Sequence, residues 1–294
     1  MESVAVIIPT YNRERLLESC VVSAVTQTHP DVTAYVCDDG STDATAGLME
    51  RLCGEFANLR YFPNRLPKGQ QGARSCALEM GSEDYVAFLD SDNRYDRQMV
   101  ARCLERFREK PEVDVVCFGQ RCVRTDSADD DCMEWMQEDL PAELHGDILE
   151  PLIRMELAID MGNCLIRRSV LDQCGGIDLS IPSYADFELH LRLARVACYD
   201  SLDEVLMDYL IHGDQITADP GKRGAGLAAI MKRDQRVFQE VGGRGAWVDV
   251  MYRLLGHAKS ARGKARFGLM RDAIAMDPLA VLQAVLKFSA KSEA

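Results

Sequence analysis

The sequence predicts an α/β fold in which helices cover both faces of a mostly parallel sheet, followed by an all-helical extension. Two observations predict it. Short runs rich in β-branched residues alternate with longer helical patterns through the first 120 residues. Strand and helix patterns of both kinds continue to about residue 219, and only helical patterns follow. Such alternation is typical of βαβ units, which build parallel sheets.

The first part of the chain repeats strand and helix in regular order. The expected strands are Val4–Ile8, Val32–Cys37, Leu59–Phe62, Tyr85–Leu89 and Val113–Phe118. The expected helices between them are Glu14–Gln27, Asp43–Phe56, Gln71–Met80 and Arg97–Glu109. Ser41 and Thr42 precede the second helix as start signals, and Pro111 ends the fourth. These boundaries place a turn after each strand.

The second part of the chain is less regular. Residues Arg124–Gly146 are polar and acidic, which predicts a surface loop or lid. A strand (Asn163–Ile166), a helix (Asp186–Val196) and an edge-like strand (Val205–Ile211) follow. The last expected helices are Ala228–Val241, Trp247–Ala261, Lys264–Met276 and Leu279–Phe288. We therefore expect a domain over residues 1–219 and a helical extension over residues 220–294.

Composition indicates a globular chain with reduced thiols. At 294 residues and 47% hydrophobic content the chain is long enough to bury a sizeable core. Its 11 cysteines include no C-x-x-C pair, and Cys37, Cys117 and Cys198 lie in apolar strand-like runs, so we expect core thiols and not a zinc site. No stretch approaches the roughly 18 apolar residues of a membrane span, and we expect a cytoplasmic protein.

Charge is distributed unevenly around the net value of −13. Residues 1–221 carry 41 acidic and 20 basic side chains, whereas residues 222–294 carry 6 acidic and 14 basic ones. Because phosphate backbones are bound mainly by Lys and Arg, the acidic body excludes nucleic acid as its partner.

Polar residues follow three of the expected strands, at Pro9–Asn12, Asp38–Asp43 and Asp90–Asn93. Open parallel sheets bind ligands beyond the carboxyl ends of their strands, so these segments are expected to form one site. The site has carboxylates but no glycine-rich phosphate cradle, and a divalent cation would supply the missing positive charge. Asp90 and Asp92 form an Asp-x-Asp turn suited to Mn²⁺ or Mg²⁺. We expect Asp92 to contact the metal, with Asp90 nearer the ribose or a metal-bound water.

The chain resembles the family-two glycosyltransferases of the GT-A fold between Ser3 and Thr217. The matching segments are VAVIIPTYNRERLLESCVVSAVTQTHPDVTAYVCDDGSTDAT, GQQGARSCAL, YVAFLDSDNRY, NCLIRRSVLDQCGGID and SYADFELHLRLA. The resemblance implies a metal-dependent, inverting transferase that moves a sugar from a nucleotide diphosphate, UDP being favoured, to an acceptor hydroxyl. Polysaccharide or glycoconjugate synthesis is the implied process, with a glycan or lipid-linked acceptor.

The resemblance also implies roles for individual residues. Tyr11 would lie against the base and Asp39 would accept a hydrogen bond from it. The implied donor-binding residues are Pro9, Thr10, Tyr11, Asp39, Lys68, Arg74, Asp90 and Ser91. Purely structural roles stay open for some of these residues. Tyr11 could pack on the surface, Asp43 could cap a helix, and Arg74 could pair with a neighbouring carboxylate.

The acceptor hydroxyl needs a base, and one positioned carboxylate is enough. The family has a Glu-Asp pair at the start of a helix, and this chain has Ala185-Asp186 there, so we assign the base to Asp186. An N-cap role for Asp186 is the alternative, and Glu188 points to another face of the helix. His212 matches a histidine in a family loop that closes over the diphosphate, and we place it with Asp92 at the metal.

The basic helical extension admits three roles. Val250, Leu254, Leu255 and Ala258 form an apolar stripe at helical spacing, which in most proteins packs on a domain. A basic amphipathic surface on anionic lipid would instead bring the enzyme to a lipid-linked acceptor, peripheral at the inner face of the membrane. Homo-oligomerisation through these helices is the third role.

Two other functions stay open. A sugar nucleotidyltransferase would carry a glycine-rich, basic loop after the first strand, where this chain has PTYNRER. A sugar-nucleotide-binding protein without transferase activity is conceivable because Ala185 interrupts the acidic pair. An NAD enzyme is excluded, since the near match at Gly224–Ala229 follows no strand.

Overall fold

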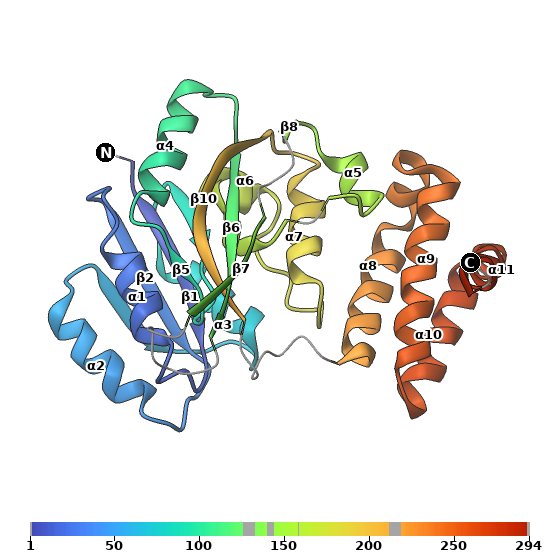
Figure 1. Ribbon diagram of the computed structural model, residues 1–294, viewed down its shortest axis with the longest axis horizontal. Coiled ribbons are helices and arrows are strands. Elements are labelled where there is room, and N and C mark those ends of the chain that lie inside the picture. The colour runs from blue at the N-terminus through green and yellow to red at the C-terminus, as the bar shows by residue number, and fades with distance from the viewer. Residues whose placement is uncertain (1, 126–132, 140–143, 158, 212–218, 293–294) are drawn as a thin grey trace. The chain divides into compact units, whose positions relative to one another are not determined.

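The computed structural model describes residues 2–125, 133–139, 144–157, 159–211 and 219–292 (Figure 1). The chain forms two compact units. The first comprises Met1–Asp147, Ile159–Leu179 and Leu193–Asp214, and the second comprises Ile148–Ala158, Ser180–Arg192 and Gln215–Ala294. A domain boundary near residue 219 stays a prediction.

Ten strands within the described residues make up one sheet in the first unit. Their bounds are β1 (Val4–Thr10), β2 (Val32–Asp38), β3 (Leu59–Pro63), β4 (Tyr85–Phe88), β5 (Arg94–Tyr95), β6 (Val115–Thr125), β7 (Met133–Asp139), β8 (His145–Gly146), β9 (Cys164–Arg167) and β10 (Tyr199–Ile211). The order is β3-β2-β1-β4-β9-β6-β10-β5, with β7 on β6 and β8 on β10.

Most of the long strands of the sheet run in one direction. β1 pairs parallel with β2 and β4, and β2 pairs parallel with β3. β9 is antiparallel to both β4 and β6, so β6 and its parallel partner β10 run with β1. The carboxyl ends of β1, β2 and β4 therefore lie at one edge of the sheet, where the sequence places its polar turns.

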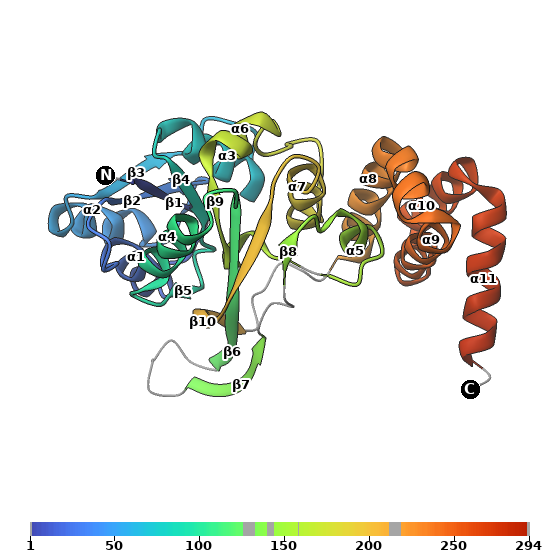
Figure 2. The same cartoon turned by 90° about the horizontal axis from the view of Figure 1, so that it is seen from above.

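Helices cover both faces of this sheet (Figure 2). Val4, Val6 and Ile8 of β1 share a core with α1 (Leu17–Val25), α2 (Thr45–Glu55) and α4 (Met99–Glu109). The intervening Ala5 and Ile7 point to the other face because side chains alternate along a strand. On that face α3 (Gln70–Met80) packs against β1 and β2, and α6 (Arg168–Gln173) packs against β9. The α/β fold expected from the sequence is confirmed.

The second unit is helical where the structure describes it. It contains α5 (Leu149–Ile153), all but the last residue of α7 (Ala185–Leu193), α8 (Pro220–Val241), α9 (Gly243–Ser260), α10 (Gly263–Met276) and α11 (Pro278–Ser292). Asp219 caps α8 by accepting the backbone N–H groups of Gly221 and Lys222 at 2.8 and 3.3 Å. Trp247 and Phe238 are fully buried at the centre of its core. The all-helical extension is confirmed.

The α9 stripe of Val250, Leu254, Leu255 and Ala258 is buried, so these residues pack on the unit as most such stripes do. No helix in the described ranges is long and apolar enough to cross a membrane. The ten cysteines of the described chain are free, as expected from their spacing.

Part of the expected loop at residues 124–146 is a strand. β7 pairs antiparallel with β6, and β8 pairs with β10. The loop prediction was therefore wrong for residues 133–139, because antiparallel pairing with the preceding strand stabilises a segment whose own acidic composition is typical of a loop. β10 is also longer than expected and has neighbours on both sides, so it is not an edge strand.

Candidate functional site

The turns that follow β1 and β2 are tied together. Thr10 ends β1 in register with Asp38, and the backbone N–H of Asp39 donates to the carbonyl of Thr10 at 2.9 Å. Asn12, at a φ of +50°, accepts the N–H of Thr42 on its side-chain oxygen at 2.8 Å. Asparagine tolerates this left-handed conformation better than most residues. Both turns therefore form one rigid rim.

Asp38 and Asp39, the two adjacent aspartates at the end of β2, have different roles. Asp38 is buried, and its Oδ1 accepts the N–H groups of Gly40 and Ser41 at 3.1 and 2.8 Å. Its Oδ2 accepts the hydroxyl of Tyr61 at 2.6 Å. Burial, and then this bond to Asp38, raise the pKa of the Tyr61 phenol. Asp38 thus shapes the turn and leaves Asp39 to face the site.

Asp39 links the β2 turn to the start of α3. Its Oδ1 accepts from the amide of Asn64 at 2.8 Å, and its Oδ2 accepts the N–H of Gly69 at 2.8 Å. Gly69 has a φ of +126°, a conformation that glycine adopts without strain. Asn64 directly follows β3, in the loop from which the sequence analysis took only Lys68 as a site residue. Applying the strand-end rule to β3 would have found it.

Tyr11 and Lys68, two of the predicted donor-binding residues, lie side by side. The Lys68 Nζ atom lies 4.8 Å from the centroid of the Tyr11 ring. The ring is 44% exposed, which leaves surface for a ligand. A cation over an aromatic face is attracted by the ring quadrupole. The pair therefore offers an aromatic surface with a positive charge next to it.

Asp90 is held by a buried arginine. Arg74 Nη2 lies 2.5 Å from Asp90 Oδ1, and Gln70 Nε2 donates to the same oxygen at 2.9 Å. The Arg74 side chain is 4% exposed, whereas that of Asp90 is 36% exposed. The pairing with a neighbouring carboxylate, left open by the sequence, is thus observed, and the carboxylate belongs to the site itself. Gln70 was missed because nothing in a single glutamine signals a site.

Asp92 lies near a second arginine, with 3.7 Å between its Oδ2 and Arg13 Nη2. Ser91 between the two aspartates is buried. The Asp90 and Asp92 carboxylates are hard oxygen donors of the kind that Mn²⁺ and Mg²⁺ prefer. Within the described residues, no group of three or more His, Cys, Asp or Glu side chains is placed to hold a metal. Asp90 and Asp92 would supply two oxygen ligands to such a cation, and substrate oxygens or water would supply the others.

Asp186 lies in the first turn of α7 in the second unit and is partly exposed. Glu188 does not replace the missing acidic partner at Ala185. It is 2% exposed, and its Oε1 accepts from Arg192 Nε and Arg233 Nη1, both at 2.6 Å. Both guanidinium groups thus keep Glu188 in the core. Asp186 is left as the carboxylate of this turn that is open to solvent.

The segment before Asp186 is held by α8. Tyr184 adopts a φ of +63°, which is uncommon for a residue with a side chain. A Cβ atom on Gly226 would lie 2.3 Å from the carbonyl oxygen of Ser183, so only glycine permits this approach of α8. The Arg223 guanidinium lies 5.5 Å from the centroid of the Tyr184 ring. Predicted residue His212 lies outside the described residues.

The sequence of the chain is similar to that of known glycosyltransferases. The family model described as "Glycosyl transferase family 2" matches residues 5–175. The Escherichia coli protein "UDP-Glc:alpha-D-GlcNAc-diphosphoundecaprenol beta-1,3-glucosyltransferase WfaP" is 38% identical over 93 residues, which cover 32% of this chain and 36% of that protein. The chain spans about a third or less of the length of the first curated relatives it matches.

Two solved structures share the fold. The crystal structure of S. aureus TarS 1-349 in complex with UDP-GlcNAc gives a TM-score of 0.67 at 16% identity, over 98% of this chain and 92% of that one. The mannosyltransferase PcManGT from Pyrobaculum calidifontis, in complex with GDP-Man and Mn²⁺, gives 0.61 at 17% identity, over 97% and 86%. At these identities the likeness concerns the fold alone, and it confirms the expected GT-A type.

Proposed function

Because the chain belongs to glycosyl transferase family 2, we propose that it moves a sugar from a nucleotide diphosphate to an acceptor hydroxyl, with inversion at the anomeric carbon. The observation that carries the proposal is the set of contacts at the strand ends. Asp39 is anchored to Gly69, and Asp90 is anchored to Arg74, so two carboxylates from separate strand ends are fixed at one rim. UDP is the favoured donor base, and polysaccharide or glycoconjugate synthesis is the proposed process.

The nucleoside is proposed to bind along Pro9, Thr10 and Tyr11, with its base against the Tyr11 ring. A carboxylate has about four lone-pair positions, and Asp39 uses two of them on Asn64 and Gly69. The others are left to accept an N–H of the base. Lys68, beside the ring, supplies positive charge toward the diphosphate. The TarS neighbour, crystallised with UDP-GlcNAc, supports this choice of ligand class.

Asp92, with Asp90 and Ser91 beside it, is proposed to hold Mn²⁺ or Mg²⁺ together with substrate oxygens. When bound, such a cation offsets negative charge on the departing diphosphate. Arg74 fixes Asp90 by its short ion pair, so the turn is oriented before any ligand arrives. The Mn²⁺ in the PcManGT structure supports the metal class. His212 is retained as a proposed ligand of the metal site.

Asp186 is proposed as the general base. It takes the proton of the acceptor hydroxyl while the oxygen forms a bond to the anomeric carbon and the bond to the diphosphate breaks. Glu188 cannot share this work because both of its oxygens are occupied by guanidinium groups. The diphosphoundecaprenol in the name of the WfaP relative supports a lipid-linked acceptor as the first class to test.

The test combines ligand binding with product detection. Thermal shifts with UDP, GDP and dTDP, each with and without Mn²⁺, identify the base, since a ligand at a hundred times its Kd adds about 2.7 kcal/mol of stability. Transfer of labelled sugar to glycan and lipid-linked acceptors then reports the reaction. Tyr11→Ala should lose the nucleotide shift, whereas Val196→Ala, at a residue of similar exposure, should keep it. Tight binding with neither hydrolysis nor transfer would favour a binding protein without transferase activity.

A further inference from the structure

Helix α11 carries its apolar residues in an unusual arrangement. Leu279, Leu282 and Leu286 are 58%, 56% and 61% exposed, whereas Ala280 and Ala284 are fully buried. A surface helix normally buries its large apolar residues and exposes its polar ones. Here the small residues face the core and the leucines face outward.

The outward leucines recur at intervals of three and four residues, so they share one side of α11. Figure 2 shows α11 beside the other helices of its unit, and no drawn element of that unit covers its outer side. The preceding helix α10 adds Phe267 and Ile274, which are 77% and 49% exposed. We call the set Phe267, Ile274, Leu279, Leu282 and Leu286 the apolar face. Exposed large apolar residues thus occur on two successive helices that contact each other, and such exposed apolar surface indicates an interaction site.

The charges around the apolar face are basic. Lys264, Arg266 and Arg271 are exposed on α10, and the sequence of α11 contains Lys287 and Lys291 but no acidic residue. Three acidic side chains of the same unit pair with basic or polar groups. Asp272 lies 3.0 Å from Lys232 Nζ and 3.3 Å from Arg271 Nη2, Asp249 pairs with Lys287, and Asp277 accepts from Arg244 and from Trp247 Nε1. Lys264 and Arg266 are exposed on α10 and add positive charge beside these pairs.

The exposed apolar residues and the basic residues around them distinguish between two partners for this face, a second copy of the chain and a lipid bilayer. In a symmetric dimer the same patch would meet itself, which would bring the exposed Lys264 and Arg266 of both copies to one interface, where their like charges repel. An anionic lipid surface instead accepts leucine and phenylalanine side chains at the acyl boundary and attracts lysine and arginine to its headgroups. Charge complementarity therefore favours the bilayer.

We propose that the apolar face of α10 and α11 docks on an anionic lipid bilayer. The stripe on α9, which the sequence offered for this purpose, is buried and cannot serve. The docking proposal does not depend on the chemistry of Asp186, because vesicle binding needs neither donor nor acceptor. It supplies a physical reason for a basic region on an acidic protein.

The experiment is flotation of the full-length protein with vesicles of phosphatidylglycerol and phosphatidylcholine in equal amounts, and with phosphatidylcholine alone. The wild type should bind the anionic vesicles at least about tenfold more tightly. Leu282→Ser with Leu286→Ser should weaken this binding by about tenfold or more. Leu179→Ser, at a residue that is 41% exposed in the first unit, is the matched control and should bind as the wild type does.

Three outcomes would overturn the proposal: absence of wild-type binding, equal binding to both vesicle types, or unchanged binding of the double variant. Light scattering coupled to gel filtration reports the rival occupant. A wild-type dimer that the double variant converts to a monomer, without a change in vesicle binding, would assign the face to a second copy. Circular dichroism melting checks that the double variant, altered only at exposed positions, keeps its fold.

Discussion

The Tyr184 hydroxyl and the His257 Nε2 atom share a hydrogen bond of 2.8 Å. Tyr184 lies two residues before Asp186 in a left-handed conformation, and His257 belongs to α9. A residue in this conformation persists only when its surroundings hold it there. The helices after residue 219 thus take part in shaping the start of α7, where the proposed base lies.

His257→Ala should lower both stability and transfer. Loss of a partly buried hydrogen bond costs about 0.5–1.5 kcal/mol, and release of the strained Tyr184 should move Asp186 away from its position. Urea unfolding and initial rates at saturating donor measure the two effects. His257→Gln, which keeps a hydrogen-bonding group, is the matched control and should recover part of both. If His257→Ala loses stability but retains full kcat, the bond only supports the fold.

The protonation of His257 should make the protein less stable in mild acid. Burial lowers its pKa, and the charges of Arg223 and Arg253 lower it further. In the unfolded chain the imidazole binds a proton at about pH 6.5, whereas folded His257 stays neutral at that pH. The contribution of neutral His257 to the free energy of unfolding is therefore complete above about pH 6.5 and decreases as the pH falls below it. Unfolding free energies of the wild type should drop between about pH 7 and 5 more than those of His257→Gln. Equal slopes for the two proteins would contradict this.

Local sequence patterns predicted the strand ends well, for a physical reason. Each parallel strand is an apolar run of a few residues that ends in a polar turn, and both signals are local. Asp39 and Asp90 could therefore be assigned to one edge before their partners were known. The partners themselves, Asn64 and Gln70, are ordinary polar residues whose roles arise from long-range contacts.

Other features depended on contacts that no local pattern encodes. β7 forms because β6 is available to pair with it. The sequence placed Glu188 on another face of its helix than Asp186, and its contacts with Arg192 and Arg233 show that this face belongs to the core. The sequence predicted a helix over Leu279–Phe288 but not which of its sides faces outward. Which side of a helix is buried is decided by its neighbours.

Asp92→Asn and Asp186→Asn should separate binding from chemistry. Both substitutions should abolish transfer, because one weakens the proposed metal site and the other removes the proposed base. Only Asp186→Asn should retain Mn²⁺-dependent binding of the nucleotide diphosphate. Isothermal titration with and without Mn²⁺ measures binding, and release of nucleotide measures turnover. The exposed Asp172→Asn is the matched control and should behave as the wild type.

Asp90→Ala should destabilise the fold more than Asp92→Ala does. Arg74 is almost fully buried and 2.5 Å from Asp90, so removal of the carboxylate leaves a buried guanidinium without its main counter-charge. Such a change costs about 3–5 kcal/mol for a fully buried pair, and less here because Asp90 is partly exposed. Asp92 lies 3.7 Å from a partly exposed Arg13, and its loss should cost about 1 kcal/mol or less. Chemical denaturation without ligand compares the two variants, and equal losses would refute the ranking.

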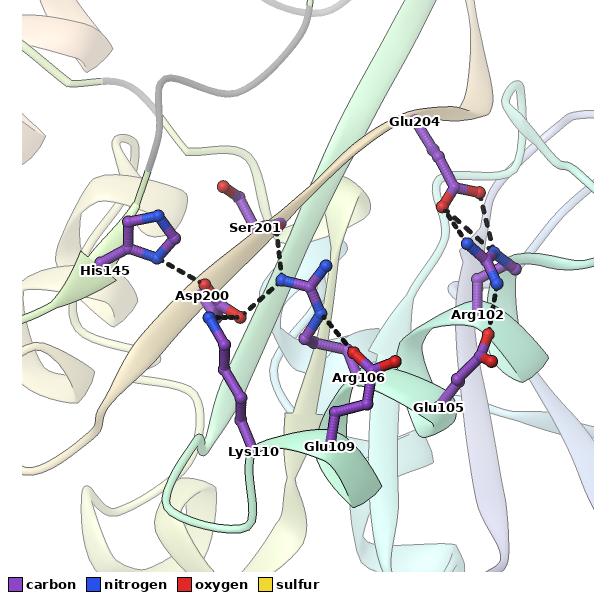
Figure 3. A network of polar contacts seen from close by, with 9 residues as sticks. All are labelled: Arg102, Glu105, Arg106, Glu109, Lys110, His145, Asp200, Ser201 and Glu204. Atoms are coloured by element: carbon purple, nitrogen blue, oxygen red, sulfur yellow. Dashed lines mark hydrogen bonds and ion pairs between the residues drawn. The ribbon is translucent and has the colours of Figure 1, made fainter.

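Asp200 is the centre of a separate polar network in the first unit (Figure 3). Its carboxylate is 1% exposed and lies 2.8 Å from Arg106 Nη1, 2.9 Å from Lys110 Nζ and 2.6 Å from His145 Nδ1. Burial opposes its ionisation, but the hydrogen bonds from these three groups outweigh burial and hold its pKa below the usual value. The cluster joins the end of α4 to β8 and β10.

Asp200→Ala should therefore cost about 1.5–3 kcal/mol of unfolding free energy, since two cations and a histidine lose their common acceptor but are themselves partly exposed to solvent. Because the folded pKa of Asp200 is lowered, its stabilisation is fully present above the unfolded carboxyl pKa of about 3.9 and is lost as pH falls through the folded value. Urea unfolding should show the difference between wild type and Asp200→Ala at neutral pH and its decline below about pH 4. Asp203→Asn, at an exposed carboxylate on the same strand, is the matched control. A difference that stayed constant down to acid pH would mean that packing, and not charge, accounts for the role of Asp200.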